Sequence, residues 1–316
     1  MAGTHEKKFL EQSITVSSLL GEEDTGLGIR LLKALAAVTA ACLLVSVLIV
    51  SSFFSAGADN REIMRAAEKV FIENKSSSPQ IFIDELKAAY TDVVGWIYVP
   101  DTLISTPILQ YDNDSYYINH NIEGKKSRYG AVFLSHSDNL DEAANDKNLL
   151  IYGNNMTDGQ MFGNLKKYRN VNFYKSTPAF YFYSEQGRYV YAVCAVQLLD
   201  SADNGGYDVS KSHFANNEEF AAWYTETKQR SIIDTGIEAY YGDRFITLIT
   251  PAPDFEGARL AVVAKRMPHV DAGVINTSAA VANGDVKYPD KWYKSRGIKL
   301  PQKNRKEEQN ASKPEG

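Results

Sequence analysis

The side chains that could carry covalent chemistry are few in this chain of 316 residues. Cys42 lies inside a long apolar run and Cys194 in the middle of a strand-like segment, where a small buried core residue is the favoured interpretation. The five histidines are scattered, and none stands at metal-ligand spacing from another. The sequence therefore predicts no disulfide framework, no metal site and no cofactor.

One short stretch, TLITPAPDFEGAR, has an unusual order of residue types. A β-branched apolar run over residues 245–250 ends at Pro251, and Pro253 follows. A short acidic loop then leads to Arg259 and to a second apolar run over residues 260–267. Two strands joined by a tight loop are expected here, with an entrance to the loop that the prolines stiffen.

The elements that must position this loop are mostly strands. Between residues 96 and 268, short apolar segments separated by turn residues recur at a density typical of a β-sandwich or a closed barrel. Residues 216–232 form a helix-like insert among them, and two helices are expected over residues 60–95, separated at the SSSPQ break. The predicted fold class is mainly β with flanking helices.

An uncharged apolar segment occupies residues 34–54 and is long enough to span a hydrocarbon core of ~30 Å. A signal peptide is the alternative, but its apolar core would be unusually long, so an uncleaved membrane anchor is favoured. Residues 1–33 precede it, and the polar part over residues 1–30 is expected to be loosely ordered. Basic residues flank both ends of the segment, so charge alone leaves the orientation open.

The overall charge and the polar C-terminal region limit the classes of partner. A formal net charge of −5 gives no reason to expect nucleic acid. Residues 269–316 are polar and become lysine-rich, which favours a solvated, flexible tail. A weak contact of this tail with anionic wall polymers is the alternative.

Three segments in order resemble the class B sortases of Gram-positive bacteria: residues 95–136, 148–168 and 245–267. The similarity runs from about Ile63 to Met267. It implies a sortase-like closed β-barrel preceded by a transmembrane helix and two N-terminal helices. It also implies that the N-terminus is cytoplasmic and that the barrel lies outside the cell, attached to the cell membrane through a single pass.

The resemblance also implies a chemistry, because class B sortases are cysteine transpeptidases. Such enzymes cut a sorting-signal peptide, hold it as a thioester and pass it to an amine of the wall or of a pilus subunit. A thiol is the nucleophile, a histidine is the acid and base, and an arginine stabilises the carbonyl oxygen. In this chain Asn154 stands at the family's histidine position, Pro251 at its cysteine position and Arg259 at its arginine position.

These replacements predict a pseudoenzyme. Asparagine has no proton to exchange near neutral pH, and proline has no nucleophilic side chain. The alternatives are an active sortase that uses Cys194 or Thr250 as a displaced nucleophile, and a structural spacer of the cell envelope. Arg259 either binds peptide or forms an ion pair with an acidic residue of its own loop, Asp254 or Glu256.

A groove that persists without its catalytic residues would bind a ligand without cutting it. The expected partners are the sorting-signal peptide of a secreted protein, a pilin or another sortase. The helix-like segment over residues 111–120, with Asn113 and Ile118, and Thr250 at the end of the penultimate strand are the predicted peptide-binding positions.

Overall fold

The computed structural model describes residues 22–74, 78–141, 147–268 and 272–301. The chain forms two compact units that divide between Ala58 and Asp59. Residues 1–21 of the predicted N-terminal tail and residues 302–316 of the predicted C-terminal tail lie outside the described residues.

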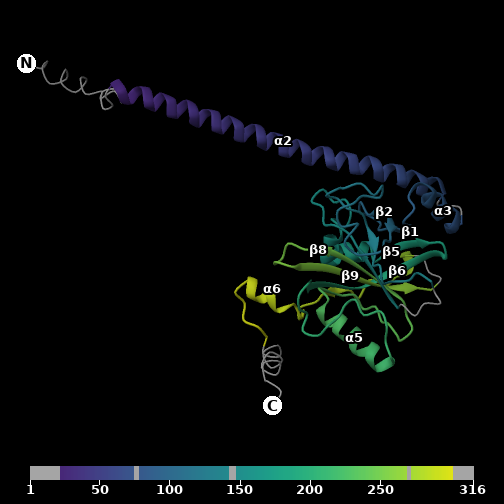
Figure 1. Ribbon diagram of the computed structural model, residues 1–316. Helices are drawn as coiled ribbons and strands as arrows, with labels where there is room; N and C mark the ends of the chain where they lie inside the picture. The colour runs from purple at the N-terminus through teal and green to yellow at the C-terminus, as the bar shows by residue number, and fades with distance from the viewer. Residues whose placement is uncertain (1–21, 75–77, 142–146, 269–271, 302–316) are drawn as a thin grey trace, which may run out of the picture. The chain divides into compact units, whose positions relative to one another are not determined.

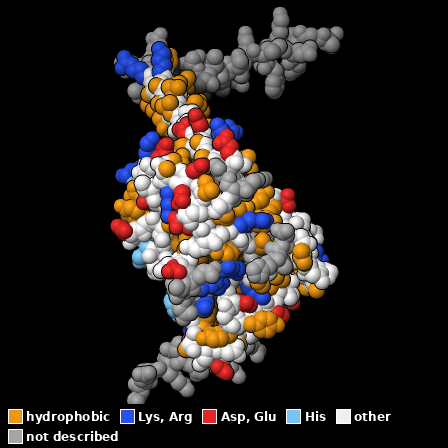
Figure 2. Space-filling view, turned by 90° about the vertical axis from the view of Figure 1, so that its right-hand side faces the viewer, with side chains coloured by type: hydrophobic (Ala, Val, Ile, Leu, Met, Phe, Trp, Pro, Cys, Tyr) orange, Lys and Arg blue, Asp and Glu red, His pale blue; other side chains and the backbone are white. Residues whose placement is uncertain are grey.

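The predicted membrane segment lies in a single helix, α2 (Glu22–Asn74) (Figure 1). Over residues 28–73 it is long and apolar enough to cross a membrane or to act as a signal sequence. Figure 2 shows its hydrophobic side chains gathered on the surface, and Leu43 and Leu48 are each 67% exposed. The loose order expected for residues 1–30 is wrong from Glu22 onward, because a formed helix extends readily into a neighbouring polar turn.

The second unit is a closed β-barrel, which confirms the predicted fold class. Its hydrogen-bonded strand order is β1-β2-β3-β4-β8-β9-β6-β5. The strands are β1 (Val93–Tyr98), β2 (Ser105–Leu109), β3 (Phe133–Leu134), β4 (Asn148–Tyr152), β5 (Ala179–Ser184), β6 (Gly187–Asp200), β8 (Phe245–Pro251) and β9 (Ala258–Met267). Most pairs are antiparallel, but β4 runs parallel to β8.

The end of α2 and a second helix, α3 (Pro79–Ala89), cover the strand β1. Phe71 of α2 stacks on Trp96 of β1 with ring centroids 4.9 Å apart, and Phe82 of α3 packs edge-on against the same indole. The two helices expected over residues 60–95 are therefore present, but the first is the end of α2.

The predicted boundary between the N-terminal helices and the barrel, after residue 95, lies too late in the chain. The strand β1 already begins at Val93, four residues after α3 ends. Its β-branched residues favour a strand, and Gly95 is needed because a Cβ there would lie 2.7 Å from the carbonyl oxygen of Tyr183 on β5.

Short elements complete the unit. The predicted helical insert is α5 (Asn217–Arg230), whose first turn is capped by the side chain of Asn216 accepting from the backbone N–H of Glu219. The remaining elements are η1 (Leu165–Arg169), α4 (Val171–Ser176), β7 (Ile233–Asp234), η2 (Ala272–Val274), β10 (Val281–Ala282) and α6 (Asp290–Ser295).

The C-terminal region is ordered where a flexible tail was expected. The strand β10 pairs with β7, and Lys287 Nζ donates to Glu226 of α5 across 2.7 Å. Tyr293 of α6 is buried, with 8% of its surface exposed. The predicted flexibility of residues 272–298 is therefore wrong. Their few aromatic and charged side chains are widely spaced in a polar sequence, and they meet the barrel only in the folded chain.

Tyr293→Ala should lower the free energy of unfolding by about 2 kcal/mol, because it removes a buried aromatic ring that anchors α6. Ser295→Ala on the exposed side of the same helix is the matched control and should stay within about 0.5 kcal/mol of the parent. Urea unfolding of residues 57–316 measures both. Equal stability of the two variants would mean that α6 does not pack on the barrel.

Candidate functional site

A hollow of about 310 Å³ lies where β4 and β8 end side by side. We call it the strand-end hollow. Its walls combine apolar and aromatic side chains with one arginine and one carboxylate. They are formed by Asp114, Ile118, Phe133, Tyr152, Gly153, Asn154, Ile249, Thr250, Pro251 and Arg259. The three positions singled out from the sequence, 154, 251 and 259, therefore line one cavity.

Three hydrogen bonds join the end of β4 to the end of β8. The N–H of Gly153 donates to the carbonyl of Ile249 across 3.1 Å. The hydroxyl of Thr250 donates to the carbonyl of Gly153 across 2.7 Å. The side-chain amide of Asn155 donates to the carbonyl of Pro251 across 2.9 Å. Thr250 is 2% exposed, so its hydroxyl fastens the two strands and does not point freely toward a ligand.

Asn154 connects the loop over residues 118–130 to the end of β4 through hydrogen bonds. Its side-chain amide donates to the carbonyls of Ile118 across 2.8 Å and Tyr129 across 3.1 Å. Gly130 makes this close approach possible: it has a positive φ of 62°, and a Cβ there would lie 2.9 Å from the Asn154 amide nitrogen. Asn154 thus acts as a donor that positions residues 118–130, a role for which its NH₂ group is well suited.

Pro251 closes β8 at the mouth of the hollow. It is exposed and stands opposite Arg259 in the antiparallel register of β8 and β9. Proline is tolerated at a strand end, where the missing N–H costs no ladder hydrogen bond. The hairpin therefore keeps its register although no thiol stands at its tip.

Arg259 faces the strand-end hollow and is half-buried. Within the described ranges its guanidinium forms no hydrogen bond or ion pair with a protein group. The alternative of an ion pair with its own loop is wrong for Asp254, which binds Arg169 across 2.6 Å and Arg296 across 3.6 Å. Glu256, the other candidate, is exposed and likewise does not contact Arg259.

The two other polar side chains of the hollow differ in their partners. Burial raises the pKa of Tyr152 to about 12, with a further contribution from Asp114 and a partial offset from Arg259. This phenol therefore keeps its proton at neutral pH. The Asp114 carboxylate accepts from the Ser135 hydroxyl across 2.9 Å and from the His136 N–H across 2.7 Å.

The predicted peptide-binding segment over residues 111–120 is a series of turns, not a helix. The side chain of Asn113 accepts from the N–H groups of Ser115 and Tyr116, each across 3.0 Å, which stabilises the turn locally. Asn113 does not line the strand-end hollow, whereas Ile118 does and is 50% exposed.

Tyr152 and Phe133 line the hollow although the sequence did not single them out. The Tyr152 ring stacks on Phe133 with centroids 5.4 Å apart, forming one wall. Tyr152 directly precedes Gly153 in the motif that located Asn154, so its place in that motif was a usable signal. Phe133 gave no signal, because only the barrel brings it to the end of β4, whereas Asp114 lies within the predicted segment over residues 111–120.

Cys194 is far from suited to nucleophilic attack. It is 1% exposed, and its thiol donates to the carbonyl of Val263 across 3.3 Å. Burial raises the pKa of this thiol to about 12, so the thiolate is scarce at neutral pH. Cys194 lies in the core packed under α5 and is absent from the lining of the strand-end hollow.

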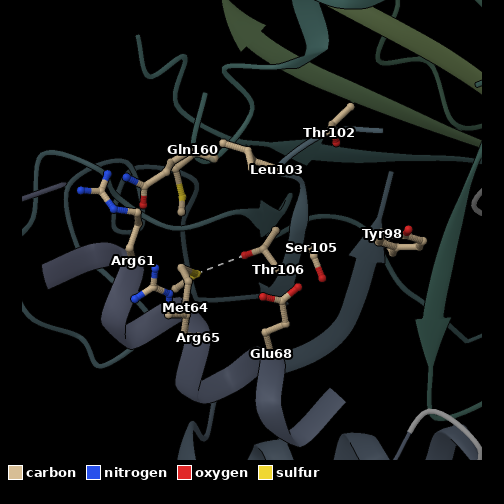
Figure 3. A pocket seen from close by; sticks show the side chains of 11 residues that line it. Arg61, Met64, Arg65, Glu68, Tyr98, Thr102, Leu103, Ser105, Thr106 and Gln160 are labelled. Atoms are coloured by element: carbon tan, nitrogen blue, oxygen red, sulfur yellow. Dashed lines mark hydrogen bonds between the residues drawn. The ribbon is translucent and has the colours of Figure 1, made fainter. Parts of the chain in front are cut away.

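A second hollow, of about 280 Å³, lies between α2 and the strands β1 and β2 (Figure 3). Arg61, Arg65 and Glu68 project into it from successive turns of α2. Arg61 is paired with Asp158 at 3.5 Å, and the Glu68 carboxylate supplies an opposing charge. This second hollow contains none of the positions 154, 251 and 259, so the strand-end hollow is the better candidate for peptide binding.

No cluster of three or more His, Cys, Asp or Glu side chains suited to a metal ion occurs among the residues described by the structure.

No protein-family model matches the chain. Among curated proteins it is 30% identical to Sortase B of Listeria monocytogenes over 213 residues, which is 65% of this chain and 84% of that protein. It is 27% identical to Sortase B of Staphylococcus aureus over 184 residues, 58% of this chain and 73% of the relative.

Solved structures give the same similarity. Sortase B from B. anthracis superposes with a TM-score of 0.59 at 26% identity, over 68% of this chain and all of that chain (100%). Clostridium perfringens sortase B superposes with a TM-score of 0.54 at 31% identity, over 58% of this chain and 99% of that chain.

The folded protein should resist thiol reagents, because the Cys194 thiol is buried and its pKa is about 12. With residues 57–316, which contain only this cysteine, we expect little reaction with an aromatic disulfide reagent at pH 8. Complete reaction should follow denaturation in guanidinium. Absorbance of the released thiolate measures both, and rapid labelling of the native protein would restore Cys194 as a candidate nucleophile.

Proposed function

Because the chain belongs to the sortase B family, we propose that it is a sortase without transpeptidase activity that binds a sorting-signal peptide, or a protein carrying one, and does not cut it. One observation carries the proposal. The strand-end hollow is present and keeps Arg259, but the positions beside it hold Pro251 and Asn154 in place of a thiol and an imidazole.

The loss of chemistry follows from these two side chains. A thioester requires a nucleophilic side chain at the tip of β8, and proline offers none. An acid and base are required for the leaving and incoming amines, and the Asn154 amide is already engaged with the 118–130 loop. With both groups absent, catalysis that depends on a covalent intermediate should be lost entirely.

The hollow nevertheless has the character of a binding site. Its volume of about 310 Å³ lies at the lower end of the range of small-ligand pockets. The walls are largely apolar, with a guanidinium and a phenol among them, so an extended peptide could bury an apolar side chain and hydrogen-bond through its backbone. This supports a binding role over that of a spacer, which would need no open cavity.

We further propose that residues 34–54 anchor the protein in the cell membrane, with the N-terminus in the cytoplasm and the barrel outside the cell. The apolar helix is long enough to cross the bilayer, and its side chains are exposed.

The chain expressed in a Gram-positive host should sediment with membranes, because an apolar helix of this length partitions into lipid. Detergent should release it and high salt should not, and protease added to protoplasts should digest the barrel. Immunoblotting of the fractions measures this. A soluble form in the medium that begins after residue 54 would instead identify the segment as a cleaved signal peptide.

The parent protein should bind fluorescent sorting-signal peptides in anisotropy titrations and should leave them intact when a nucleophilic amine is added. The physical reason is an open hollow without a nucleophile. Mass spectrometry of the peptide and the protein measures cleavage and acylation. An acyl adduct on the chain would overturn the pseudoenzyme proposal, and its position would identify the nucleophile.

The double variant Asn154→His plus Pro251→Cys is the matched comparison. It restores the family's side chains at the two altered positions, and we expect it to form a detectable acyl adduct with the peptides that the parent binds. If the parent binds no peptide and the double variant forms no adduct, a structural spacer of the cell envelope is favoured.

A further inference from the structure

We propose that the strand-end hollow selects peptides ending in a free carboxylate, which Arg259 binds, over the same peptides with an uncharged end. This inference rests on the proposed peptide-binding role and specifies the chemical class of the ligand. Such a peptide is the product of hydrolysis of a peptide bond, so a separate protease, or a transpeptidase that uses water as the acceptor, would supply it.

The guanidinium of Arg259 carries a positive charge that no protein group of the described residues neutralises. Arg259 is half-buried in the wall of the hollow, and among the described residues no acidic group pairs with it. The acidic side chain of its own loop, Asp254, is neutralised by Arg169 and Arg296. A permanently charged guanidinium that is partly desolvated and has no ion-pair partner among the described residues favours an anionic ligand.

The hydrogen-bond donors and acceptors that line the hollow differ in how far protein groups already engage them. The carbonyls of Ile118, Gly153 and Pro251 already accept hydrogen bonds from Asn154, Thr250 and Asn155. In the described part of the chain, the Tyr152 hydroxyl, like the Arg259 guanidinium, forms no hydrogen bond with a protein group. Three carbonyl acceptors at this cavity are therefore engaged while the guanidinium and the phenol remain open as donors, which favours a ligand that brings acceptors.

Asp114, the one acidic residue in the lining of the hollow, is held by partners other than Arg259. The Asp114 carboxylate accepts from the Ser135 hydroxyl and the His136 backbone N–H, and Nδ1 of the His136 ring lies 3.2 Å away. These donors hold the Asp114 carboxylate against residues 135–136, which directly follow β3. Asp114 therefore does not compete for the guanidinium, and its negative charge limits the hollow to ligands with little excess charge.

A single carboxylate fits this arrangement better than a phosphate. The planar guanidinium can form two parallel hydrogen bonds with a carboxylate, and such charge-assisted bonds are about twice as strong as neutral ones. A phosphate carries more charge and more acceptors than one arginine and one phenol can satisfy. The apolar residues Ile118, Phe133 and Ile249 provide a surface for the side chain next to the carboxylate.

The experiment uses the full chain in detergent micelles and pairs of fluorescein-labelled sorting-signal peptides. Each pair has one sequence and ends either in a free carboxylate or in a carboxamide. We expect the free acid to bind about fivefold more tightly than the amide, a preference that shrinks with added salt. A third peptide, amidated and with Glu as its last residue, separates a terminal carboxylate from a side-chain carboxylate.

Arg259→Gln should abolish the difference in affinity between acid and amide, and the ratio of the two dissociation constants is the readout. Arg266→Gln is the matched control, because Arg266 lies on the same strand over the ring of Tyr189 and outside the hollow. Arg259→Lys keeps the charge and should retain part of the preference. Thermal melting of each variant verifies folding.

The outcomes separate the two proposals. Equal binding of acid and amide by the parent would overturn the carboxylate inference and leave peptide binding standing. A preference that survives in Arg259→Gln would also overturn it, as would equal affinity for the third peptide and the free acid. If neither peptide of any pair binds, both proposals are wrong.

Discussion

The parallel pairing of β4 with β8 is the constraint on which the rest of the site depends. Parallel neighbours end at the same edge of a sheet, so residues 153–155 and 249–251 meet there although they are nearly a hundred residues apart in sequence. The Thr250 hydroxyl and the Asn155 amide then fix this edge. Because β8 also forms a hairpin with β9, the same pairing delivers Arg259 to the cavity.

Distant segments hold the two loops that border this edge. The Asn154 amide fastens residues 118–130 on one side. On the other side, Asp254 of the β8–β9 loop pairs with Arg169, and Lys291 of α6 reaches the carbonyl of Glu256 across 3.4 Å. Asn154 and Pro251 are thus part of a well-connected scaffold. A binding surface can persist when a nucleophile is lost, because its shape depends on these contacts and not on the thiol.

Much of the fold could be predicted because its signals are local. Apolar runs bounded by turn residues located the strands around β8 and β9, and an uncharged run located the helix α2. The errors occurred where stability comes from non-local contacts. The tail over residues 272–298 looks polar, but its order arises from pairing with β7 and from burial of Tyr293. Similarly, helical spacing continued past Ala89, whereas pairing with β2 and β5 makes residues 93–98 a strand.

The sequence by itself determined that the side chains at positions 154 and 251 offer no nucleophilic or acid–base group in any fold. It also determined that an arginine opens the last strand. Only the tertiary structure decided what that arginine faces. Asp254 lies five residues from Arg259, yet it pairs with Arg169, which is 85 residues away. Ion pairs and cavities depend on distances in space, and chain spacing does not set these between separate strands and loops.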